Sequence, residues 1–257
     1  MEIDRSWQTY RSMVNNALAI FSINLDILKK FPSETMHKVV QCALPYQMDE
    51  NGLPDSQHYQ DLMNQVFKIL VQVGALPSTL YAGHVFSLGH VQLYFYCQNP
   101  QPVLDVLKQF EQIQQTSVQD DPNWDTYFDF LLPSPLEVKI NATEEVLDML
   151  RQSGRDLADT FLIEHNFHFE DEDSMYRFME HMNLQSIDFV AIKYSHSPIM
   201  LEEDEPIYMV KIEQELALNT LDIFQHVETF EQIASQLGGE YMGWECDSIN
   251  QDKGQLN

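Results

Sequence analysis

The chain has 257 residues, of which 44% are hydrophobic, enough to bury a core in one large domain or in two ordinary ones. Its 40 acidic and 14 basic residues give a formal net charge of −26. A field of that sign repels phosphate backbones and attracts basic protein surfaces, so it disfavours direct binding to nucleic acid and favours a basic protein partner. Solubility alone explains the same charge equally well.

The charge is unevenly divided, since residues 1–133 hold 14 acids and 7 bases whereas residues 134–257 hold 26 acids and 7 bases. Cys42, Cys97 and Cys246 are widely spaced and form no C-x-x-C pair, which is typical of reduced thiols in a cytosolic protein. The acidic start and the lack of any run of eighteen apolar residues predict neither export nor a membrane-spanning segment. We therefore expect a cytoplasmic protein.

Hydrophobic spacing in the first half predicts seven elements in the order ββαββαβ. The helices show apolar residues three and four positions apart, and two of the strands flank the turn at Ser87-Leu88-Gly89. The last strand is predicted from its dense aromatic residues. The elements are strands at 18–25 and 39–46, a helix at 59–74, strands at 80–86 and 91–97, a helix from 100 or 102, and a strand at 124–132.

The second half begins with a capped helix around residues 143–151, which we interpret as a connector. The order that follows is βαββαβ: strand 161–169, helix 173–183, strand 187–194, strand 207–218, helix 220–237 and strand 240–249. The two orders predict an α+β protein of two ferredoxin-like sandwiches with antiparallel sheets. The predicted domains are 1–133 and 159–257, with a helical connector at 134–158.

The closing helix and strand are the most informative stretch. Asn219 and Thr220 can cap the helix, and Gly238-Gly239 end it, because glycine adopts the left-handed conformation without a Cβ penalty. In the strand that follows, Tyr241 and Trp244 are three positions apart. Strand side chains alternate between faces, so we expect these two on opposite sides of the sheet, one buried and the other available to a partner.

This unit, ending in Glu240, Tyr241, Gly243 and Trp244, resembles the close of the regulator B family of bacterial proteins that inhibit ribonuclease E. Ile163-Glu164-His165, followed by an acidic helix start, has the order that opens that family's domain. The resemblance covers roughly residues 159–249. It implies a domain that binds ribonuclease E, or a comparable RNA-processing factor, and lowers its activity.

The first half resembles an uncharacterised bacterial domain family that occurs fused to the regulator-like domain. The features that carry this resemblance are the leading hairpin, N-G-L-P before a helix, and Tyr94-Phe95-Tyr96 in a strand. It implies no activity.

Catalytic, cofactor and metal sites are not predicted. His165 and His168 lie in one strand at positions that face opposite sides, so they cannot close on one ion without a bulge. His84 and His90 lie on opposite arms of a hairpin, without a carboxylate or thiol at ligand spacing. Cys246 stands between two acids that disfavour a thiolate, and G-x-S-x-G and glycine-rich phosphate loops are absent. We expect no enzyme and no cofactor.

Two acidic clusters and two aromatic residues are the candidate partner-binding residues. They are Glu202, Glu203, Asp204, Glu205, Glu170, Asp171, Glu172, Asp173, Tyr241 and Trp244. Carboxylates at 170–173 also favour a helix start, and those at 202–205 are equally typical of a solvated loop. The leading hypothesis is a regulator that binds a basic protein surface. The alternatives are an immunity-type inhibitor of a basic toxin nuclease and an enzyme with an inter-domain pocket.

Overall fold

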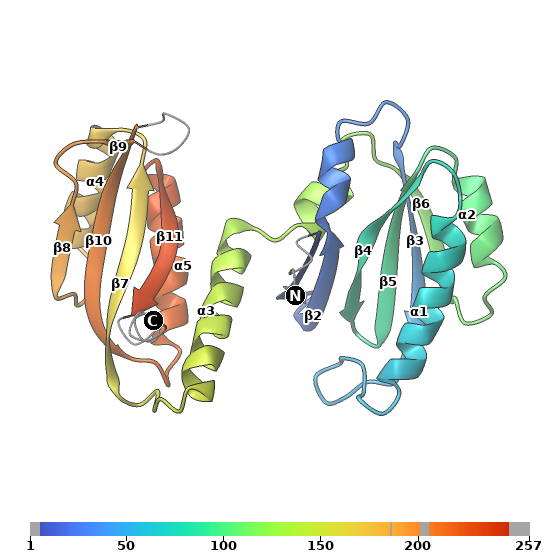
Figure 1. Ribbon diagram of the computed structural model, residues 1–257, viewed down its shortest axis with the longest axis horizontal. Coiled ribbons are helices and arrows are strands. Elements are labelled where there is room, and N and C mark those ends of the chain that lie inside the picture. Colours follow the sequence, from blue (N-terminus) through green and yellow to red (C-terminus); the bar gives the residue numbers. More distant parts are fainter. Residues whose placement is uncertain (1–5, 186, 201–205, 247–257) are drawn as a thin grey trace, which may run out of the picture. The chain divides into compact units, whose positions relative to one another are not determined.

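The computed structural model describes residues 6–185, 187–200 and 206–246. The chain folds as two compact units, Met1–Pro133 and Ser134–Asn257, here called the N-terminal and C-terminal domains. Each combines helices with one main antiparallel sheet (Figure 1). The predicted fold class, α+β with two antiparallel sheets, is confirmed. Across the described ranges, no helix is both long and apolar enough to cross a membrane.

The N-terminal sheet has six strands in the order β1-β2-β4-β5-β3-β6, and every neighbouring pair is antiparallel. Its strands are β1 (Trp7–Val14), β2 (Ala17–Asn24), β3 (Lys38–Pro45), β4 (Thr79–Ser87), β5 (His90–Cys97) and β6 (Gln115–Asp120). Its helices are α1 (Tyr59–Gly74), α2 (Pro100–Leu107), a 3-10 helix η1 (Leu25–Lys30) and a π-helical turn η2 (Thr126–Leu131).

Both faces of this sheet contribute to a core, as the alternation along β5 shows. Val91, Leu93 and Phe95 point to one face and pack with α1 and α2. Tyr94 and Tyr96 point to the other, which is covered in part by residues of η1 and η2. Only part of the second face is covered in this way, and the rest of it borders a groove.

The strand predicted at 124–132 is wrong. Trp124 and Tyr127 are fully buried, but Tyr127 lies in the helical turn η2 and Trp124 lies just before it with a φ of +59°. Asp121 accepts hydrogen bonds from the amide of Asp125 (2.7 Å) and from the Tyr96 hydroxyl (2.5 Å), and so orders the turn where it begins. The last strand of the domain is instead β6, whose residues are all exposed. An edge strand without buried residues has no apolar periodicity to reveal it.

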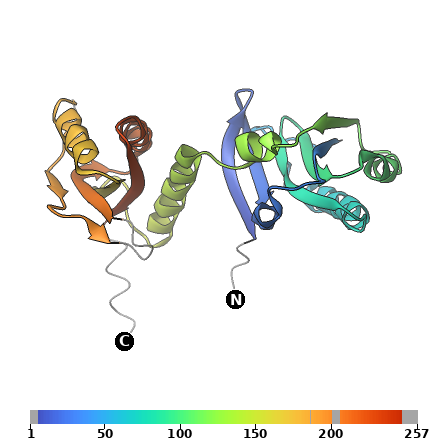
Figure 2. The same cartoon turned by 90° about the horizontal axis from the view of Figure 1, so that it is seen from above.

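The C-terminal sheet has the order β11-β7-β10-β8, and the short β9 also pairs with β10. Its strands are β7 (Thr160–Phe169), β8 (Ala191–Tyr194), β9 (Ile199–Met200), β10 (Pro206–Ala217) and β11 (Gly239–Cys246). Its helices are α3 (Pro135–Gln152), α4 (Glu172–Asn183) and α5 (Asp222–Gln236). Helices α4 and α5 lie on one face of the sheet (Figure 2).

Helix α3 is longer than the predicted connector helix and packs within the C-terminal domain. Ser134 and Glu137 form a capping box at its start. Thr143, Leu147 and Leu150 are buried where the helix packs against α5 and β11. The segment expected to join two domains thus contributes to the core of one of them.

Candidate functional site in the C-terminal domain

Close packing requires glycine at position 239 of the closing strand, and backbone conformation requires it at position 243. A Cβ atom on Gly239 would lie 2.2 Å from Cε1 of Phe169, a buried ring, so no larger residue fits without moving that ring. Gly243 has a φ of +104°, a region that other residues rarely adopt. The pairing of β11 with β7 shifts register between Tyr241 and Gly243, which marks a β-bulge.

The bulge corrects the prediction for Tyr241 and Trp244. One extra residue in β11 lets Tyr241 pair with Phe167 and Trp244 pair with His165, and both partners point toward the helices. Tyr241 is fully buried, and Trp244 is partly buried with its Nε1 donating a 2.9 Å hydrogen bond to Thr143 Oγ1. The expectation of opposite faces is therefore wrong. These two residues secure the core and α3.

A buried polar group lies beneath this strand. Nδ1 of His165 is 2.8 Å from the Tyr241 hydroxyl, and the imidazole is fully buried. Burial first, and the nearby His226 second, lower the pKa of His165 to about 3. Burial also raises the pKa of Tyr241. Both groups are therefore uncharged at neutral pH, which suits the inside of a folded domain better than a charged pair would.

The histidines considered as metal ligands do not come together. His165 is buried while His168 on the same strand is partly exposed on the opposite face. His84 bonds the Tyr81 hydroxyl at 2.6 Å and lies on the α1 side of its sheet beside Phe86, whereas His90 follows the opposite face with Gln92. Within residues 6–185, 187–200 and 206–246, no group of three His, Cys, Asp or Glu residues is arranged to hold a metal ion.

A surface feature that sequence reasoning missed is an exposed aromatic cluster, here called the tyrosine patch: Tyr176, Tyr194 and His196. The Tyr176 and Tyr194 rings are 6.0 Å apart, and Tyr194 and His196 are 4.7 Å apart. Tyr176 is 44% exposed and Tyr194 is 38% exposed. Partial desolvation and then the negative charge of Glu172 raise the pKa of Tyr176.

Carboxylates adjoin the tyrosine patch at the start of α4. Asp171 is occupied as the N-cap, because its carboxylate accepts hydrogen bonds from the Ser174 amide and hydroxyl, both at 2.8 Å. The same bonds lower the pKa of Asp171. Glu170, Glu172 and Asp173 are exposed. Two exposed carboxylates, Glu172 and Asp173, therefore lie in the first turn of the helix that carries Tyr176, and a third, Glu170, lies just before its N-cap.

The second acidic cluster, Glu202, Glu203, Asp204 and Glu205, lies outside the described residues. The described residues that flank it are informative, because Met200 and Pro206 pair with each other. Two residues further along β10, Tyr208 pairs with Phe169, the end of β7 that leads into α4. The chain on either side of the second cluster is thus anchored at the end of the sheet where α4 begins.

The comparisons with known proteins agree with this division of the chain. Residues 140–246 match the family described as Regulator of ribonuclease activity B. The C-terminal domain is therefore similar to the regulator of ribonuclease activity B family. Residues 5–132 match a family of unknown function, DUF695. Both predicted resemblances are confirmed, and the chain joins an uncharacterised domain to a domain that resembles a regulator.

Other similarities are distant. No curated protein matches the chain. One solved structure, a crystal structure of an unknown protein from Galdieria sulphuraria, is 11% identical with a TM-score of 0.24, and the match covers 81% of this chain and 95% of that one.

Proposed function

We propose that the regulator-B-like domain binds a ribonuclease, ribonuclease E by resemblance, in the cytosol and lowers its activity without catalysing a reaction. The family match carries this proposal. The regulator family is not a catalytic one, so the chain acts by occupying a surface of its partner. In this mechanism, acidic residues cover a basic patch that otherwise attracts RNA.

The docking surface we propose is the tyrosine patch with the acidic residues around it. Aromatic side chains at the centre of an interface supply most of the binding energy, and charges at its rim speed association with a partner of opposite sign. Tyr176 and Tyr194 supply the centre. Glu170, Glu172 and Asp173 supply the rim. We propose that the cluster at 202–205, which lies outside the described residues, also contributes to binding the basic partner.

Four basic side chains of the domain pair with acids outside the rim, whereas Arg177 lies on α4 close to Asp171. The ion pairs are Lys139 with Glu231, Arg151 with Asp148, Lys193 with Glu213, and Lys211 with Glu164. Carboxylates in excess of these pairs remain to meet a basic partner, and their attraction weakens as salt screens it.

The test measures binding of the full-length chain to purified ribonuclease E by surface plasmon resonance at low and high salt. Neutralising the rim with Glu170→Gln, Glu172→Gln and Asp173→Asn is expected to slow association by about tenfold at low salt. The matched control neutralises two glutamates and one aspartate on another helix, α3, with Glu144→Gln, Glu145→Gln and Asp148→Asn. It is expected to change association much less.

The aromatic centre is tested separately by Tyr176→Ala and Tyr194→Ala. Each change is expected to cost about 2 kcal/mol of binding, which raises Kd by roughly thirtyfold through faster dissociation. Equal effects of both charge triplets, or an affinity that does not change with salt, would contradict this docking surface. Binding to a basic toxin nuclease in place of ribonuclease E would favour the immunity-type alternative.

A further inference from the structure

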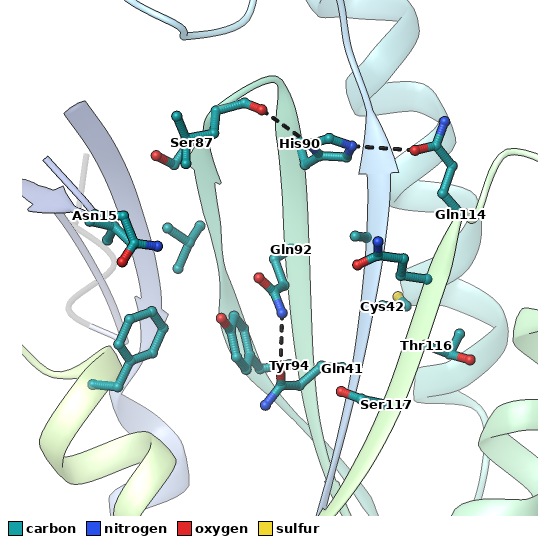
Figure 3. Close-up of a pocket in the computed structure, with 16 residues that line it drawn as sticks. Asn15, Gln41, Cys42, Ser87, His90, Gln92, Tyr94, Gln114, Thr116 and Ser117 are labelled. Atoms are coloured by element: carbon teal, nitrogen blue, oxygen red, sulfur yellow. Dashed lines mark hydrogen bonds between the residues drawn. The ribbon is translucent and has the colours of Figure 1, made fainter. Parts of the chain in front are cut away.

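The face of the N-terminal sheet opposite α1 and α2 is closed at one end and open at the other. At the closed end, Trp124, Tyr127 and Leu131 pack against Tyr96. At the open end lies a groove of about 720 Å³ (Figure 3), here called the amide groove. Its floor is formed by β3, β4 and β5, one wall by β6 and the residue before it, and the other wall by the β1–β2 turn and η2.

The strands place polar side chains in this groove through their alternation. Along β5, Val91 and Leu93 pack under the helices while His90, Gln92 and Tyr94 line the groove. Neighbouring strands continue the same face. The residues with side-chain amides in the lining are Asn15, Gln41, Gln92, Gln114 and Gln115.

The amide groove is lined without carboxylates, ammonium groups or guanidinium groups. None of its 16 lining residues is Asp, Glu, Lys or Arg, although 21% of the chain is charged. Anionic ligands such as phosphates are bound by cationic groups or by helix N-termini, and the groove offers neither among these residues. The lining therefore suits a ligand that is uncharged and rich in hydrogen-bonding groups.

Several polar atoms in the groove have unused hydrogen-bonding capacity. Nε2 of Gln92 donates a 2.8 Å hydrogen bond to Oε1 of Gln41 (Figure 3). The side-chain carbonyl of Gln92 and the side-chain amino group of Gln41 therefore remain available to bond a ligand. The Tyr94 hydroxyl has no hydrogen-bond partner in the described part of the chain, although this side chain is only 3% exposed. Because Tyr94 lines the groove, its hydroxyl is available to donate a hydrogen bond to a ligand there or to accept one.

An aromatic wall adjoins these polar groups. The rings of Tyr94 and Phe130 are 5.9 Å apart, and Phe130 is 38% exposed at the edge of the groove. The groove thus combines an apolar wall with amides that both donate and accept hydrogen bonds. We propose that it binds an uncharged saccharide, whose hydroxyl groups also donate and accept and whose ring carries an apolar C–H face.

The direction of the polar groups favours a saccharide over a peptide. Ser87, Gln92, Gln41 and Ser117 belong to β4, β5, β3 and β6, so the polar lining runs across four strands. A peptide that extends a sheet instead runs along one edge strand and pairs through its main chain. The volume lies within the range of pockets that hold small organic ligands, and it accommodates a short oligosaccharide.

The experiment titrates the full-length chain with the neutral trisaccharides maltotriose, cellotriose and chitotriose and follows backbone amide signals by NMR. At least one trisaccharide is expected to shift signals of β3, β5 and β6 in a saturable way. A singly phosphorylated form of that sugar is expected to bind at least tenfold more weakly. Tyr94→Phe and Gln92→Ala are each expected to weaken the neutral sugar by about fivefold or more.

Gln72→Ala is the matched control, because Gln72 is an exposed glutamine of α1 on the other side of the sheet. It should leave sugar binding unchanged. Tyr94→Phe removes only one oxygen atom, so this variant is expected to keep the NMR spectrum of the folded wild type. A weaker affinity with that spectrum unchanged would show loss of binding without loss of fold. The proposal is overturned if the chain binds none of the three sugars. It is also overturned if Tyr94→Phe and Gln92→Ala bind the sugar as tightly as the wild type does. Stronger shifts of the same signals by a neutral tripeptide or by uridine overturn it too.

Discussion

The buried imidazole of His165 makes the stability of the C-terminal domain depend on pH in a predictable way. Its pKa in the folded chain is about 3, well below the usual 6.5 that it regains on unfolding. Between these two values the unfolded chain binds a proton that the folded chain does not bind. The free energy of unfolding therefore falls as pH drops from 6.5 towards 3, and this contribution is constant above neutral pH.

The magnitude follows from that difference in proton binding. Lowering the pH from 7 to 5 costs about 2 kcal/mol of stability through His165 alone, and this value holds for any folded pKa well below 5. Other groups also titrate in this range, among them His226, whose pKa is lowered by burial. A comparison of variants isolates the contribution of His165, because the other groups remain in both proteins.

The assay is urea unfolding of the full-length chain at pH 7, 6 and 5, followed by NMR signals from the C-terminal domain. His165→Gln keeps a polar partner for Tyr241. In this variant the fall in the free energy of unfolding between pH 7 and pH 5 is expected to be about 2 kcal/mol smaller than in the wild type, whatever its stability at pH 7. His168→Gln, on the partly exposed face of the same strand, is the control and should lose less. The reasoning fails if His165→Gln and the wild type show the same pH dependence.

Three further changes test the packing, each read as a shift in the urea midpoint of the affected domain. Gly239→Ala is expected to cost about 2 kcal/mol because its Cβ would overlap the Phe169 ring, and an unchanged midpoint would mean that β11 can move away. Trp244→Phe removes the bond to Thr143 and should cost about 1 kcal/mol, with larger hydrogen-exchange rates in α3; unaltered exchange would show that this bond does not hold the helix. Asp121→Ala leaves three donors without their acceptor and should cost about 3 kcal/mol, whereas a loss below 1 kcal/mol would show that water replaces the carboxylate.

The sequence by itself determined those features that depend on neighbours along the chain. The apolar stripe of α1 and the alternation of β5 predicted their elements because residues three to four apart, or two apart, share a face. The pair Gly238-Gly239 marked the end of α5 for the same local reason. These patterns were sufficient to predict two α+β domains, whereas both family resemblances came from short motifs such as the Glu240, Tyr241, Gly243 and Trp244 unit.

Only the tertiary structure decided features that depend on which strands meet. The bulge in β11 places Tyr241 and Trp244 on one face, and no pattern in β11 alone shows where its partner β7 loses register. Tyr176 on α4 and Tyr194 on β8 come from different elements, and their rings meet only in the folded domain. The amides of the groove likewise come from separate strands, brought together by the order of the sheet. Local periodicity reports the face of a side chain, whereas its neighbours across a sheet are fixed by pairing between distant segments.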